Sequence, residues 1–176
     1  MAFWRKRIEL PDTFYQAAGD CLLYFTESQT KVHLIETSFM SVHNACELLD
    51  LVEEGFAKLA DLIRSFPVNT DSLVAQFDMT DDIQTCEKRR SALLAMPEIE
   101  PSEAISSWPD QIDGYETRQF QRSVLNMQTI FGMQIQKIMK AMAKAANINS
   151  SDFTTLAMRA AAATPRGQAA YAICPR

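Results

Sequence analysis

One stretch, from Gln111 to Ala146, constrains the fold of this chain more than any other feature. Its apolar side chains recur every three or four residues, which places them on one side of an α-helix, where residues are about 100° apart. The apolar positions are Phe120, Val124, Met127, Phe131, Ile135, Ile138 and Met142. Such a stripe must be covered by the rest of the chain or by a partner, because in water it becomes an association site. The stretch therefore predicts one long helix that packs along a single face.

The opposite side of the same predicted helix is basic. It carries Arg118, Arg122, Lys137, Lys140 and Lys144. Cations along one helix face can contact phosphates, acidic lipid headgroups or an acidic protein surface, and they can also simply be solvated. We treat this basic face as the candidate surface for a partner or an anion.

A second long amphipathic pattern runs from about Lys31 to Phe66, where Pro67 stops it. Its polar side is acidic. This acidic face consists of Glu36, His43, Glu47, Asp50, Glu54 and Asp61, with His33 beside them. Gly55, in the middle of the pattern, indicates a kink or a close approach to another helix.

Shorter helical patterns fill most of the remaining chain. The first starts at Asp12 and ends near Thr26 to Thr30. The second runs from about Asp71 to Met96, with a polar break at Asp78 to Asp82. The third starts at a Ser150 or Ser151 cap and ends at Thr164 to Gly167. The last nine residues are either a short docked helix or a mobile tail. Because glycines are few and no series of alternating strands occurs, we predict an all-α fold. The expected architecture is a helical bundle of about five helices, two of them long and amphipathic.

Charge and proline content divide the chain into three parts. We expect an acidic helical region at 1–96, a proline-rich linker at 97–109 and a basic region at 110–176, which together form one compact domain. The net charge is −12 up to Glu116 and +7 after it, for a total of −5. This asymmetry suggests attraction within the fold, head-to-tail contact between copies, or an anionic partner.

The N-terminal arm combines aromatic and basic side chains. These are Phe3, Trp4, Arg5, Lys6 and Arg7. Such an arm can anchor to a membrane surface, stack on nucleic-acid bases or dock on its own domain. One basic triplet carries too little charge for stable membrane anchoring.

No residue pattern predicts a reaction. Cys21, Cys46, Cys86 and Cys174 lack metal-binding spacing, and we expect them to be reduced thiols in a cytoplasmic protein. His43 and Glu47 could ligate a metal only if another helix supplied matching ligands, and a helix cap explains Asp78, Asp81 and Asp82 better than a magnesium site does. Because glycine-rich phosphate loops and nucleophile elbows are also missing from the sequence, we expect no catalytic residue, no metal and no cofactor.

These observations favour a protein that acts by binding. We expect a non-catalytic adaptor, scaffold or assembly subunit that contacts another protein or a second copy of itself, using adaptable methionine-rich surfaces. Two alternatives stay open. One is an amphipathic coat protein on a lipid or hydrophobic granule surface. The other is a helical subunit of a nucleoprotein complex that contacts phosphates through the basic face.

Overall fold

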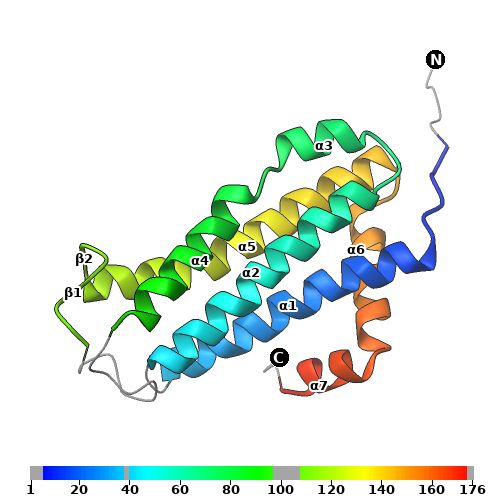
Figure 1. Cartoon of the computed structure of the whole chain (residues 1–176). Coiled ribbons are helices and arrows are strands. Elements are labelled where there is room, and N and C mark those ends of the chain that lie inside the picture. The colour runs from blue at the N-terminus through cyan, green and yellow to red at the C-terminus, as the bar shows by residue number, and fades with distance from the viewer. Residues whose placement is uncertain (1–5, 38–39, 97–107, 174–176) are drawn as a thin grey trace. The chain divides into compact units, whose positions relative to one another are not determined.

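The computed structural model describes residues 6–37, 40–96 and 108–173. Within them the chain forms seven helices and one small hairpin (Figure 1). The elements are α1 (Asp12–Thr37), α2 (Val42–Ser65), α3 (Thr70–Gln76), α4 (Thr80–Leu94), β1 (Gln111–Ile112), β2 (Tyr115–Glu116), α5 (Thr117–Ala145), α6 (Ser150–Ala162) and α7 (Pro165–Ile173). The predicted all-α fold is confirmed, with more helices than expected.

The chain is built of two compact units. Unit 1 comprises Met1–Leu23, Lys58–Asp78 and Met133–Arg176, and unit 2 comprises Tyr24–Ala57 and Met79–Gly132. The helices α1, α2 and α5 contribute residues to both units. Each unit combines residues from before and after 97–107, a segment outside the described residues, so a linker at 97–109 stays a prediction.

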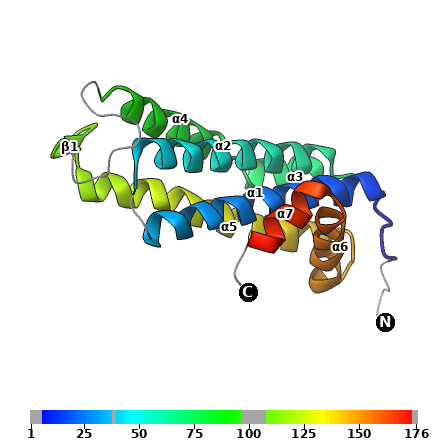
Figure 2. The ribbon, with the colours of Figure 1, turned by 90° about the horizontal axis from the view of Figure 1, so that it is seen from below.

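Aromatic side chains form the core of unit 1. The ring of Phe14 on α1 lies 5.5 Å from that of Phe66 and 6.1 Å from that of Phe153 on α6, measured between centroids. Gly19 brings the backbones of α1 and α6 together, because a Cβ atom at this position would lie 2.6 Å from the carbonyl oxygen of Ala157. Figures 1 and 2 show α6 crossing α1 at this end of the helix.

Unit 2 is centred on Phe131 of α5. Its ring is fully buried and packs edge-on against Phe56 of α2 and Phe25 of α1. A Cβ atom at Gly55 would lie 2.3 Å from the tip of this ring, so the predicted close approach at Gly55 is confirmed. All seven apolar positions of the predicted stripe are buried, which makes the stripe core rather than exposed surface.

The boundary between the first two helices was predicted wrongly. The polar run 26–30 lies within α1, which continues to Thr37, and α2 begins only at Val42. The hydroxyls of this run are satisfied inside the helix, because they bond back to carbonyls about one turn earlier. Ser28 donates to the oxygen of Phe25 at 2.7 Å, and Thr30 donates to that of Thr26 at 3.1 Å.

The start of the predicted long helix is a hairpin instead. The strands β1 and β2 pair antiparallel, and the turn between them places Asp113 and Gly114 at φ values of 53° and 80°. Asp-Gly is the favoured dipeptide of such two-residue turns, because both positions need positive φ. The helix therefore begins at Thr117.

Other predicted boundaries were nearly correct. The expected break at Asp78 to Asp82 separates α3 from α4, but the predicted aspartate cap is wrong. The cap position is Met79, which makes no side-chain cap hydrogen bond, and Asp81 and Asp82 lie in the first turn of α4. The cap of α6 is Asn149, one residue before the predicted serines, and its side chain accepts from the N–H of Ser151 at 2.9 Å. The predicted end at Thr164 to Gly167 lies just after α6, which stops at Ala162. Pro165 in this run begins α7, since proline is favoured in a first helical turn.

Candidate functional site

The basic face is solvent-exposed along the whole of α5. Arg118 and Arg122 lie in unit 2, and Lys137, Lys140 and Lys144 lie in unit 1. Among the described residues, none of these five cations makes an ion pair. Their charge is therefore not balanced by direct contacts within the described part of the protein.

The predicted acidic face is divided between two helices. Because the first helix extends to Thr37, Glu36 and His33 belong to α1, and only the other members lie on α2. The prediction that they share one helix was wrong. Glu36 and Glu54 are exposed and make no ion pair with any described residue, whereas Asp61 pairs with Arg64 at 3.1 Å on the same helix.

Two members of the acidic face pair with cations on neighbouring helices of unit 2. Glu47 on α2 pairs with Lys31 on α1 and accepts from Nε2 of His43 at 2.8 Å. The Lys31 contact lowers the pKa of Glu47. Asp50 lies 2.7 Å from Nε of Arg90 on α4. These contacts join α1, α2 and α4, so this part of the acidic face is structural as well as exposed.

Arg89 ties the hairpin to α4. Its side chain, only 12% exposed, lies over the rings of Tyr115 and Phe120 and reaches Oδ2 of Asp113 at 3.3 Å. From the sequence alone, the basic run at 88–90 predicts a solvated helix face. That expectation fails for Arg89, because the guanidinium group stacks on aromatic faces while pairing with a carboxylate.

Sequence reasoning missed a carboxylate pair between α2 and α4. The side chains of Glu53 and Glu87 are hydrogen-bonded, with Asp50 and Arg90 beside them and Asp82 near the adjacent thiol of Cys86. Burial, and then the hydrogen bond and repulsion from Glu87, raise the pKa of Glu53 to about 7. Two carboxylates in contact share a proton, because both cannot ionise at low cost. No sequence spacing predicts this pair, because its members come from different helices.

This pair should make unit 2 less stable as the pH rises. The folded protein holds the proton of Glu53 up to about pH 7, whereas the unfolded chain releases it near the ordinary value of 4.5. The stabilising contribution is thus complete in acid and is lost as the pH rises through 7. We expect urea titrations from about pH 5 to about pH 8 to show a smaller loss of unfolding free energy for Glu53→Gln than for the wild type.

The matched control is Glu36→Gln, an exposed carboxylate that makes no ion pair with a described residue. It should keep the wild-type pH dependence. Equal slopes for the wild type and Glu53→Gln would contradict the shared proton.

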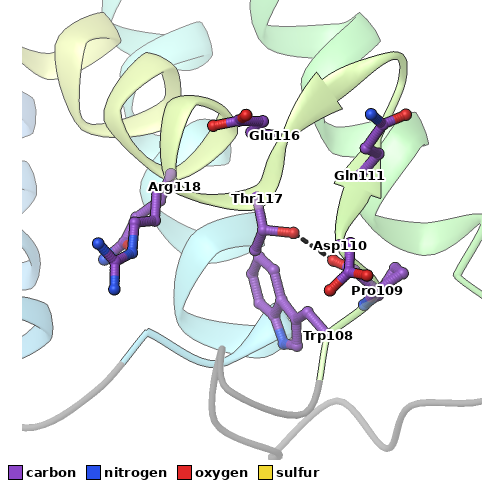
Figure 3. A pocket seen from close by; sticks show the side chains of 8 residues that line it. Trp108, Pro109, Asp110, Gln111, Glu116, Thr117 and Arg118 are labelled. Atoms are coloured by element: carbon purple, nitrogen blue, oxygen red, sulfur yellow. Dashed lines mark hydrogen bonds between the residues drawn. The ribbon is translucent and has the colours of Figure 1, made fainter.

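An open hollow of about 660 Å³ lies beside the hairpin in unit 2 (Figure 3). Trp108 is nine-tenths buried, and its Nε1 has no hydrogen-bond partner within the described residues. Thr117 closes one side by donating to the carbonyl oxygen of Pro109. The lining also contains Asp110, Gln111, Glu116, Arg118 and Gln121. These groups can hydrogen-bond a polar chain, and the lining residues that the structure describes include no imidazole or thiol.

The cysteines of the described residues are poor nucleophiles. Cys21, Cys46 and Cys86 are buried and free. Burial raises the pKa of Cys21 and of Cys86 to about 12 and also raises that of Cys46. Since the thiolate is the reactive form, these thiols behave as core side chains. Cys174 lies outside the described residues.

The remaining sequence predictions are only partly placed. Phe3, Trp4 and Arg5 lie outside the described residues, while Lys6 and Arg7 are exposed. In the part of the chain that the structure describes, no group of three His, Cys, Asp or Glu side chains could hold a metal ion. None of the described helices combines the length and apolar character needed to cross a bilayer.

A comparison with known proteins found no matching family model, curated protein or solved structure.

Proposed function

We propose that this chain is a non-catalytic helical binding protein, an adaptor, scaffold or assembly subunit, whose contact surface includes the second half of α5. The observation that carries the proposal is the lysine stripe, defined as Lys137, Lys140 and Lys144. These residues are exposed, share one helix face and have no acidic partner among the described residues. Unpaired cations at this spacing suit an acidic surface on a protein partner.

The charge of the two units supports the same proposal. Unit 1 contains 11 basic and 7 acidic residues, a net charge of +4, whereas unit 2 contains 6 basic and 15 acidic residues, a net charge of −9. Opposite potentials on two parts of one chain steer charged partners during encounter. The exposed Met133, one turn before Lys137, adds an adaptable apolar contact beside the stripe.

We expect the lysine stripe to be required for capture of a protein partner. The full chain, its Lys137→Gln/Lys140→Gln/Lys144→Gln variant and an Arg118→Gln/Arg122→Gln control should be immobilised and exposed to extract from the native source. Quantitative mass spectrometry should find proteins held by the wild type and the arginine control but reduced at least about tenfold by the lysine variant, because neutralisation removes the steering charges and the pairs.

Two further binding assays separate the alternatives. Cosedimentation with anionic vesicles tests a coat protein, and retention on single-stranded DNA tests a nucleoprotein subunit. A lysine-dependent signal only in one of these assays would replace the protein-partner proposal. Identical capture by the wild type and the lysine variant would remove it.

A further inference from the structure

The surface of this chain also contains an acidic counterpart to the lysine stripe. Glu47, Asp50, Leu51 and Glu54 of α2 line an open hollow of about 300 Å³ in unit 2, here called the acidic hollow. Its three carboxylates occupy positions i, i+3 and i+7 of their helix. The three lysines of the stripe on α5 have the same spacing.

We propose that the lysine stripe of one copy docks on the acidic hollow of a second copy. This inference rests on the proposed function and names the partner surface of the same site. Equal spacing matters because residues seven apart in a helix are separated by about 10 Å along its axis and lie on nearly the same side. Two helices side by side and running in the same direction therefore bring all three lysines opposite the three carboxylates.

The three carboxylates of the hollow outnumber the two cations that contact them, which leaves a local net charge of −1. Lys31 contacts Glu47 and Arg90 contacts Asp50, whereas Glu54 has no ion pair within the described residues. The hollow belongs to the unit of net charge −9, and the stripe belongs to the unit of net charge +4. Leu51, which also lines the hollow, is the apolar residue on which the lysine methylene groups can pack while the ammonium groups stay hydrated.

The contact joins two different surfaces, and every copy carries both. Copies can therefore form a two-fold dimer in which the contact occurs twice, close a larger ring or grow as a chain. Because the contact is electrostatic, association should weaken when salt is raised from about 0.1 M to about 1 M, which shortens the Debye length from about 10 Å to about 3 Å.

Complementary variants test the inference on the full chain by sedimentation velocity. Lys137→Glu/Lys144→Glu destroys only the stripe, and Glu54→Lys alters the hollow at its one carboxylate that has no ion pair among the described residues. The wild type should associate as its concentration rises. Each variant alone should have a dissociation constant at least about tenfold higher than that of the wild type, because like charges then oppose one another. An equal mixture of the two variants should form a dimer, since one intact stripe meets one intact hollow.

The control is Arg118→Glu/Arg122→Glu, which reverses two exposed cations of the same helix outside the stripe. It should associate like the wild type, and circular dichroism should show that all variants keep their helices. A monomeric wild type, a mixture that stays monomeric, or a control as weak as the stripe variant would overturn the inference. If lysine neutralisation abolishes capture of another protein while sedimentation stays unchanged, the proposed function stands and the contact between copies is wrong.

Discussion

Replacing Phe131 with alanine should lower the free energy of unfolding by about 3–5 kcal/mol, the usual cost of deleting a buried aromatic ring. The ring has no exposed surface, and its centroid lies 5.2 Å from that of Phe56 and 6.2 Å from that of Phe25. Its loss leaves a cavity where α1, α2 and α5 meet in unit 2. Gly55 cannot fill this cavity, because it has no side chain.

Urea or thermal unfolding of the Phe131→Ala variant measures this loss. The matched control is Met133→Ala, because Met133 lies two residues further along α5 and is half exposed; it should cost no more than about 0.5 kcal/mol. Combining Phe131→Ala with Gly55→Ala adds a second check. The methyl group of Gly55→Ala clashes with the ring of Phe131 when that ring is present but enters the cavity when it is absent. The double variant should therefore lose less unfolding free energy than the sum of the two single losses. A loss below about 1 kcal/mol for Phe131→Ala would show that the ring is not the centre of this core.

Replacing Gly19 with valine should lower the free energy of unfolding by about 1–3 kcal/mol or more, as overpacking of a tight contact does. A Cβ atom there would lie 2.6 Å from the carbonyl oxygen of Ala157 and 3.0 Å from the backbone nitrogen of Ala161. Backbone atoms cannot turn aside as a flexible side chain can. The helices α1 and α6 must therefore separate, or the chain must adopt another packing.

Gln16→Val is the control for this substitution, since Gln16 is exposed on the same helix and the new residue has the same low helix propensity. Hydrogen exchange followed by mass spectrometry should show faster exchange in 150–162 for Gly19→Val and not for Gln16→Val. Equal stability of the two variants would mean that α6 is not packed against α1 at Gly19.

Local sequence patterns determined much of the fold. Apolar residues spaced three or four apart identified the buried side of α5 correctly at all seven positions, because helical periodicity is a property of the local chain. A polar run predicted the break between α3 and α4. Gly55 predicted either a kink or a close approach, and the structure has the close approach. It failed at the end of α1, where hydroxyls of the polar run bond within the helix, and at the Asp113-Gly114 turn, whose signal was present but was assigned to the helix.

Tertiary structure alone decided which faces meet. The sequence by itself determined that α5 has an apolar side and a basic side, and that the helix containing Glu47, Asp50 and Glu54 is acidic on its polar side. It did not determine that Glu53 meets Glu87, that Arg89 is enclosed by Tyr115 and Phe120, or that Gly19 lies against Ala157. Periodicity assigns a residue to a side of its own helix, whereas a contact between helices depends on their packing, which residues distant in the chain establish together.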